Sequence, residues 1–239
     1  MELKPERLTT EDFAEQEISL CGKSFFAHMS GGLYWPSEKA LIVADLHLEK
    51  GSSFAARGQM LPPYDTRETL HRLANTIDHC GAETVIALGD SFHDRTAGER
   101  MSGEDLETLA IMQDSCEWIW IAGNHDPEIP ENVRGYVIPE LTASGITFRH
   151  EPKVGPVTHE VAGHLHPAAK ISLNGFSLRR PCFVGNGVRL IMPAFGAFTG
   201  GLNILDDVFS PHLGNEGVNV WMLGQEGLYP VASRLLRED

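Results

Sequence analysis

The chain has 239 residues, of which 42% are hydrophobic and 22% charged, with neither a low-complexity tract nor an internal repeat. This composition is ordinary for a soluble globular protein and leaves ample room for a core. Acidic residues outnumber basic ones by 33 to 19, so the net charge of −14 argues against a basic face that grips a long stretch of nucleic acid.

The first residues, "MELKPERLTTEDFAEQE", are polar and acidic, unlike a signal peptide or a transit sequence. No apolar run approaches the length that spans a membrane. The 4 cysteines are scattered without a CxxC pair, as is typical of reduced thiols. We therefore expect a cytoplasmic protein that has no membrane partner.

In the first half of the chain, the predicted strands alternate with predicted helices. Three apolar runs have the length and composition of strands: 40–44 ("ALIVA"), 84–88 ("TVIAL") and 118–122 ("WIWIA"). Apolar residues at helical spacing predict helices over 65–80 and over 102–113, where Ser102 is the expected N-cap. This alternation indicates βαβ units.

Beyond about residue 134 the pattern changes to short strands and turns, which predicts a mostly antiparallel arrangement. The expected strands lie within 134–139, 145–150, 169–174, 176–186, 188–196 and 217–224. No linker-like segment separates the two halves. We therefore expect an α/β fold with a two-sheet core in a single domain over 1–239.

A further short strand is predicted at 159–162 ("HEVA"), and polar residues follow this strand and four of those above at the point where each strand ends. The motifs are "DLH" at 45–47, "GDSFH" at 89–93, "GNHD" at 123–126, His150, and "GHLH" at 163–166. Taken singly, each motif is more typical of a turn or a surface pair. Taken together, Asp, His and Asn side chains form the nitrogen and oxygen ligand set of Mn²⁺, Fe²⁺ and Zn²⁺. Because ligands bind beyond the carboxyl ends of strands in open α/β sheets, we predict a site for two divalent ions.

The order DxH, GDxxH, GNHD, H and GHxH over residues 45–166 resembles the calcineurin-like metallophosphoesterases. The resemblance implies a two-sheet β-sandwich flanked by helices, in α/β/β/α layers. It implies a first metal held by Asp45, His47, Asp90 and His166. It implies a second held by Asp90, Asn124, His150 and His164, with Asp90 bridging. Mn²⁺ is the expected ion, with Fe²⁺ or Zn²⁺ as alternatives.

Two such ions about 3.5–4 Å apart would lower the pKa of a bridging water, so the expected nucleophile is a metal-bridging hydroxide. By the same resemblance His125 is the expected general acid for the leaving oxygen, and Asp126 is expected to orient it. For His93 two roles stay open: contact with a phosphate or nucleotide, or capping of its own loop.

Two further segments, 45–73 and 179–203, resemble the bacterial ligase-associated metallophosphoesterases, the PdeM family of DNA damage response endonucleases. That resemblance implies a Mn²⁺-dependent DNA endonuclease of DNA repair that accompanies a DNA ligase, a helicase and an exonuclease. Glu49 departs from the pattern, which has glycine there. Candidates for contact with phosphate, or else solvated surface residues, are Lys50, Arg57, Arg95, Arg179 and Arg180.

The acidic balance favours a single-stranded or flexible DNA substrate over a long duplex. One alternative is a metallophosphoesterase for small nucleotides or cyclic phosphodiesters. A second is a scaffold that has this fold without catalysis, although none of the expected ligands is missing. The role of the segment after about residue 205, beyond completing the sheets, stays open.

Overall fold

The computed structural model describes residues 14–59, 61–62, 64–173, 175–214 and 217–239. The N-terminal stretch that we expect not to be a signal peptide therefore lies mostly outside the described residues. Within the described ranges, no helix combines the length and the apolar character needed to cross a membrane.

Seven strands form the first sheet, in the order in which they occur along the chain. They are β1 (Glu15–Leu20), β2 (Lys23–His28), β3 (Leu33–Trp35), β4 (Ala40–Val43), β5 (Thr84–Ala87), β6 (Glu117–Ile121) and β7 (Tyr136–Ile138). Strands β1 to β4 are antiparallel, and β4 to β7 are parallel. Parallel neighbours need crossover connections, and helices supply those from β4 to β5 and from β5 to β6, whereas a loop without a helix joins β6 to β7. These helices are α1 (Lys50–Ala56), α2 (Asp65–Cys80), α3 (Ala97–Arg100) and α4 (Gly103–Ser115).

The second sheet contains the remaining strands and is mainly antiparallel, as predicted. They are β8 (Leu141–Ala143), β9 (Ile146–Arg149), β10 (Glu160–Ala162), β11 (Pro167–Leu173), β12 (Phe176–Gly185), β13 (Arg189–Ile191), β14 (Leu202–Asn203), β15 (Asn219–Leu223) and β16 (Leu228–Val231). Parallel pairing occurs between β9 and β10, β10 and β13, and β11 and β14. The change of pattern expected near residue 134 comes one strand later, because β7 still pairs in parallel with β6.

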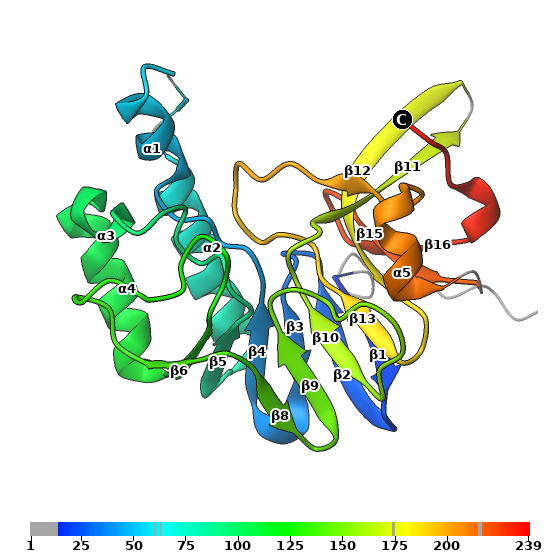
Figure 1. The fold of residues 1–239 in the computed structure, drawn as a ribbon, viewed down its shortest axis with the longest axis horizontal. Helices are drawn as coiled ribbons and strands as arrows, with labels where there is room; N and C mark the ends of the chain where they lie inside the picture. Colours follow the sequence, from blue (N-terminus) through cyan, green and yellow to red (C-terminus); the bar gives the residue numbers. More distant parts are fainter. Residues whose placement is uncertain (1–13, 60, 63, 174, 215–216) are drawn as a thin grey trace, which may run out of the picture.

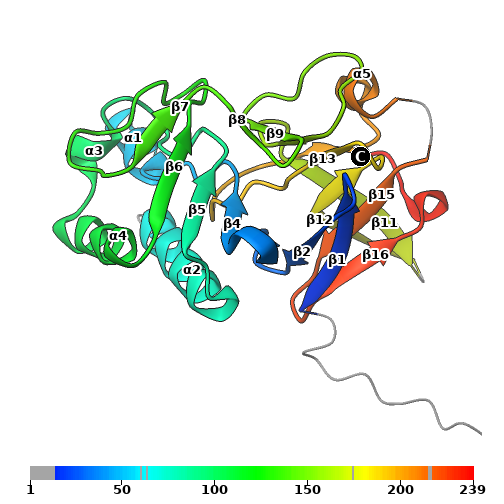
Figure 2. The ribbon, with the colours of Figure 1, turned by 90° about the horizontal axis from the view of Figure 1, so that it is seen from below.

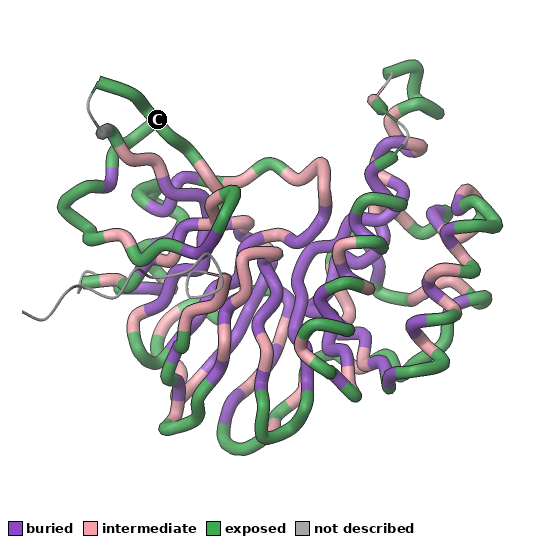
Figure 3. The backbone as a smooth tube through the Cα atoms, turned by 180° about the vertical axis from the view of Figure 1, so that it is seen from behind, coloured by how far each residue is buried: buried purple, intermediate pink, exposed green. Residues whose placement is uncertain are grey.

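The position of strand β4 between two hydrophobic clusters explains why its sequence is apolar throughout. Leu41 and Val43 contribute to the hydrophobic cluster under the helices, while Ala40 and Ile42 contribute to the cluster between the sheets. Alternate residues of a strand point to opposite faces, so a strand covered on both faces is apolar at every position. In Figure 3 the central strands are accordingly among the most buried parts of the chain.

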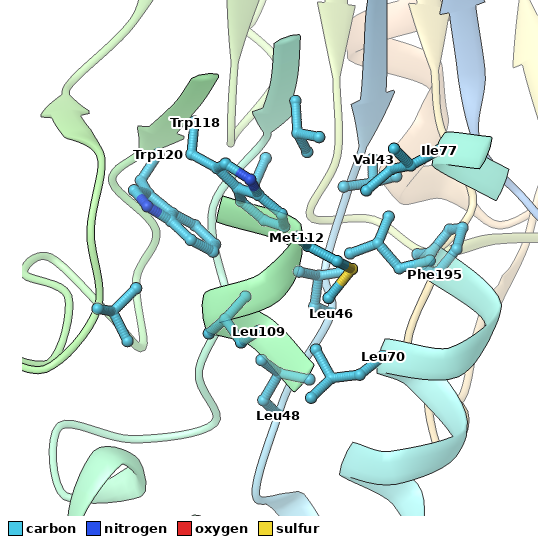
Figure 4. Packing of buried hydrophobic residues seen from close by; sticks show 14 of the residues in the cluster. Val43, Leu46, Leu48, Leu70, Ile77, Leu109, Met112, Trp118, Trp120 and Phe195 are labelled. Carbon is cyan, nitrogen blue, oxygen red and sulfur yellow. The ribbon is translucent and has the colours of Figure 1, made fainter. Parts of the chain in front are cut away.

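Two hydrophobic clusters hold the layers together. Between the sheets, Trp35 stacks on Phe148 with ring centroids 5.6 Å apart. On the outer face of the first sheet, Leu70 of α2 and Leu109 of α4 pack with Trp118 (Figure 4). Figures 1 and 2 show these helices on one side of the molecule and the second sheet on the other.

The far side of the second sheet is covered by a third cluster that includes residues of α5 (Ser210–Leu213). The predicted α/β/β/α layering is therefore confirmed. The N-cap prediction also holds, since the Ser102 hydroxyl accepts a hydrogen bond from the backbone N–H of Asp105 at 3.1 Å. Short 3₁₀ helices occupy Pro36–Glu38, Asp207–Phe209 and Ser233–Leu235.

Candidate metal centre and active site

The polar residues predicted to converge do so, and they come from both sheets. Asp45 and His47 follow β4, Asp90 follows β5, and Asn124 follows β6 in the first sheet. The second sheet supplies three histidines after β9 and β10: His150, His164 and His166. Side chains from five strands therefore meet at one end of the sandwich.

The first donor group contains Asp45, His47 and His166, whose ligand atoms all lie within 4.8 Å of one another. Nε2 of His166 lies 3.3 Å from Oδ1 of Asp45 and 3.3 Å from Nε2 of His47. Nδ1 of His166 lies 3.2 Å from the carbonyl oxygen of Gly200. A Nδ1–H that donates to this carbonyl would leave the Nε2 lone pair free to bind an ion.

The second donor group contains Asp90, His150 and His164. Nε2 of His150 lies 3.0 Å from Nδ1 of His164 and 3.5 Å from Oδ2 of Asp90, while its Nδ1 donates to the carbonyl of Leu88 at 2.9 Å. The side-chain amide of Asn124 lies 3.4 Å from Nδ1 of His164. Asn124 thus stands beside the group to which the resemblance assigns it.

These residues fit a pair of divalent ions on several grounds. Two ligand atoms that share one ion lie roughly 3–3.5 Å apart, given metal–ligand bonds of about 2.0–2.2 Å, and the donor pairs above have this spacing. Oδ1 of Asp45 is buried and has no hydrogen-bond partner among the described residues. Buried acceptors without a partner are costly unless a cation satisfies them.

The pKa directions of three ligands suit metal binding, whereas the pKa of His166 is raised in the metal-free site, because the effect of burial is outweighed by the contact with Asp45. Burial above all lowers the pKa of His47 to about 3, and burial followed by the nearby His150 lowers that of His164. Burial alone would raise the pKa of Asp45, but the contact with His166 and the charges of its histidine neighbours bring it below its ordinary value. Neutral imidazoles and a carboxylate are the forms that bind metals.

The backbone at the ligands is unusual. Asp45, His47, Asp90, His164 and His166 all have φ between +44° and +71°. This left-handed region is uncommon for residues other than glycine and is typical of functional sites. The preceding strands set the direction of the chain, and the left-handed turn redirects each side chain.

Two glycines allow the ligand loops to approach closely. A Cβ at Gly123 would lie 2.1 Å from the backbone N of Asp90 and 2.4 Å from its Oδ1. A Cβ at Gly163 would lie 2.7 Å from Oδ2 of Asp45. Glycine is therefore required at both positions by the lack of space for a side chain.

His125 lies beside the second donor group, whereas Asp126 makes contacts that were not predicted. The His125 side chain is 49% exposed, and its Nε2 lies 3.9 Å from Oδ2 of Asp90. Oδ2 of Asp126 accepts hydrogen bonds from the backbone N–H groups of Ser91 at 2.6 Å and Phe92 at 3.1 Å. The described hydrogen bonds of Asp126 therefore position the loop after Asp90, and none of them reaches the His125 side chain.

His93 lies within the site and links it to α1. Its ring stacks on that of His125, with 5.4 Å between centroids and 18° between planes, and lies 5.7 Å from the ring of His47. Phe54 of α1 also lies beside His93, with 5.8 Å between the ring centroids. Burial lowers the pKa of His93, and the positive charges of Lys50 and Arg57 are among the further causes.

Phe54 was not singled out in the sequence, although a signal was available. Lys50, Phe54 and Arg57 are spaced i, i+4 and i+7, the spacing that places residues on one face of a helix. The buried positions of α1 are Gly51 and Ser53. Of these three residues, Phe54 contacts the His93 ring, while Lys50 at the start of α1 and Arg57 just after its end act on His93 through their charges.

The other candidate arginines differ in their positions. Arg180 and Arg179 line a cavity of about 110 Å³ together with the candidate ligand His166. The Arg179 guanidinium is engaged by Asp239 at 3.0 Å and by the carbonyl of Gly201 at 2.6 Å. Arg95 is exposed and lines a separate hollow with three glutamates. No described contact connects Arg95 with the metal ligands.

Glu49, where the family pattern has glycine, adopts φ +66° and is buried. Its carboxylate accepts hydrogen bonds from Thr66 at 2.9 Å and from Ser52 at 2.5 Å. Glycine suits this position because the left-handed conformation costs it nothing. For Glu49 the left-handed conformation is unfavourable, and the hydrogen bonds of its carboxylate offset this cost. They also hold the start of α1 against α2.

A model of the family described as calcineurin-like phosphoesterase matches residues 39–192, the segment that carries every candidate ligand. The chain belongs to this family. Its members are metal-dependent phosphoesterases, so the two donor groups of this calcineurin-like phosphoesterase are its candidate metal sites.

Among solved structures, the calcineurin-like phosphoesterase is similar to the nuclease MPE of Pseudomonas putida. The two are 28% identical, with a TM-score of 0.70, over 91% of this chain and 100% of that chain. This neighbour is consistent with the ligase-associated branch of the family.

Two further matches have lower scores. Yfce, a phosphoesterase from E. coli, is 15% identical with a TM-score of 0.42, over 81% of this chain and 98% of that chain. A Zn²⁺ complex of Vps29 from Entamoeba histolytica is 14% identical with a TM-score of 0.36, over 80% of this chain and 96% of that chain. No curated protein matches the chain.

Proposed function

We propose that the protein is a dinuclear metal-dependent phosphodiesterase that cuts single-stranded or flexible DNA internally. The metal ligands would be the seven residues Asp45, His47, Asp90, Asn124, His150, His164 and His166, with Mn²⁺ as the expected ion. When bound, two such ions supply activation of water and neutralisation of charge on the phosphoryl oxygens.

The remaining steps belong to side chains of this chain. His125 stands at the exposed edge of the donor groups, where its imidazolium can donate a proton to the leaving oxygen as the P–O bond breaks. Asp126 holds the backbone of Ser91 and Phe92, and so positions the loop that carries Asp90 and His93. We assign Asp126 a positioning role.

The observation that carries the choice of substrate is a set of three rings in successive contact beside the donor groups. His125 stacks on His93, and Phe54 follows at 5.8 Å, with Lys50 and Arg57 close enough to affect the pKa of His93. Aromatic rings flanked by cations bind unpaired bases and the phosphates between them. The bases of a duplex are already stacked, so this arrangement favours a single strand.

The net charge of −14 agrees with a local footprint of this kind. Because so acidic a protein would bind long DNA weakly, we also propose that a partner of DNA repair delivers the strand. A DNA ligase, a helicase and an exonuclease are the partners that the family resemblance suggests.

Mn²⁺-dependent cleavage of circular single-stranded DNA tests the proposal, because circles have no ends and any cut reports endonuclease action. Wild type should convert circles to linear strands, and His125→Ala should not. A panel of nucleotides and cyclic phosphodiesters is assayed in parallel. Faster turnover of a small nucleotide than of DNA would overturn the choice of substrate. Absence of hydrolysis of every substrate in the panel would support a non-catalytic scaffold.

A further inference from the structure

A third group of metal-ligating side chains lies far from the candidate active site. Glu15, His28 and His79 place one ligand atom each within 4.8 Å of one another. His79 is in the last turn of α2, next to the start of β5, whereas the active-site loops follow the ends of the strands. Helix α2 has 16 residues and so spans about 24 Å between the two regions.

The three side chains are brought together by sheet pairing and helix packing. Glu15 and His28 are direct partners in the antiparallel pair of β1 and β2, so their side chains point to the same face. Nε2 of His79 lies 3.2 Å from Oε1 of Glu15, and the rings of His79 and His28 have centroids 5.1 Å apart. The 3.2 Å spacing resembles that of the donor pairs in the candidate active site.

Ser30 fixes the orientation of the His28 ring. Nδ1 of His28 accepts a hydrogen bond from the backbone N–H of Ser30 at 3.1 Å and lies 2.8 Å from Oγ of the same residue. Burial, followed by the nearby His79, lowers the pKa of His28 and so favours the neutral imidazole, the form that binds metals. A cation at His79 would also lie at the C-terminal end of α2, where the helix dipole favours positive charge.

We propose that Glu15, His28 and His79 form a zinc site that fastens the first β-hairpin to the C-terminal end of α2. Two imidazoles and one carboxylate form a ligand set that Zn²⁺ accepts, with water in the fourth position. The site is independent of the proposed nuclease activity, and it would act on stability because it would link α2 to the first hairpin through His79, Glu15 and His28.

The test measures zinc content of the full-length protein after dialysis against buffered micromolar Zn²⁺. His79→Ala and Glu15→Gln should each hold one ion per chain fewer than wild type. His71→Ala, an exposed histidine on the same helix, should hold as many as wild type. Equal zinc content in wild type and His79→Ala would overturn the proposal.

Two further readouts separate a lost site from a damaged fold. Added Zn²⁺ should raise the melting temperature of wild type more than that of His79→Ala. Hydrolysis of a small chromogenic phosphodiester by His79→Ala should equal that of wild type, since no residue of this group lies in the active site. A parallel fall of hydrolysis and zinc content in both His79→Ala and His28→Gln would contradict a separate site.

Discussion

The imidazole rings of His93 and His125 are stacked, with 5.4 Å between their centroids and 18° between their planes. The two residues follow different strands, β5 and β6, and the stack therefore depends on how the two loops are held. His93 contacts both His125, which lies beside the donor groups, and Phe54 of α1. Under the proposed function, His125 serves the chemistry, and the neighbouring rings of His93 and Phe54 bind the substrate.

His125→Ala should lower kcat by about 10²–10⁴-fold, the contribution typical of general acid catalysis. Metal content should be unchanged, because the side chain of His125 belongs to neither donor group. Mass spectrometric metal analysis beside steady-state kinetics checks both statements, with His71→Ala as control. A loss of metal in proportion to activity would show that His125 is a ligand and not an acid.

Gly123→Ala should disrupt the metal centre although it adds only one methyl group. That carbon would lie 2.1 Å from the backbone N of Asp90 and would force the loop of this ligand to move. We expect metal affinity to fall by about tenfold or more. Gly103→Ala is the matched control, because a Cβ there has no atom within 4 Å. Equal metal affinity in the two variants, measured by titration, would contradict the close approach.

Phe54→Ala should raise KM for single-stranded DNA while leaving hydrolysis of a small phosphodiester unchanged. Stacking of a base on an aromatic ring contributes about 1–3 kcal/mol, which corresponds to a rise of about fivefold to a hundredfold. Tyr136→Ala removes an exposed aromatic ring from β7, away from α1, and should leave KM unaltered. An equal effect of Phe54→Ala on both substrates would point to a role in folding instead.

The metal-free protein should show a pH dependence that originates at Asp126. Burial, and then the charge of Asp90, raises the pKa of Asp126 to about 7 in the folded state. The folded state therefore holds a proton that the unfolded state releases above about pH 4, so this group lowers stability as pH rises from about 4 to 7.

Urea unfolding of chelator-treated protein measures this contribution. Asp126→Asn lacks the titrating group, so wild type should lose stability relative to the variant between pH 5 and pH 8. A difference between the two proteins that stays constant over this range would rule out the raised pKa. Added Mn²⁺ should diminish the pH effect, since nearby cations favour the carboxylate.

The sequence was most informative where an apolar strand and the polar residues of the loop after it are adjacent in the chain. The apolar run that became β4 and the polar residues behind it predicted both a buried strand and the delivery of Asp45 and His47. The same logic applied after β5, β6, β9 and β10, because strand ends are local features that parallel pairing brings together. Convergence at the site was therefore predictable before any packing was known.

Features that arise from contacts between distant segments could not be predicted in this way. Glu15 and His79 are 64 positions apart and meet only because α2 packs beside the first hairpin. The bonds of Asp126 to the loop after Asp90 depend on the approach of two loops, which the spacing "GNHD" does not reveal. Strand β1 was missed as well, because its polar sequence "EQEISL" shows burial only at Ile18 and Leu20.

The left-handed backbone at Asp45, His47, Asp90, His164 and His166 has a consequence for how this chain can change. Each such residue costs about 1–3 kcal/mol relative to glycine or an ordinary backbone geometry. Glycine at these positions would relax the metal-free chain, and it would also remove the ligand. At these positions, a substitution that raises the stability of the metal-free protein therefore also lowers its activity. A search for heat-resistant variants that does not also select for activity should accumulate changes at the ligands first.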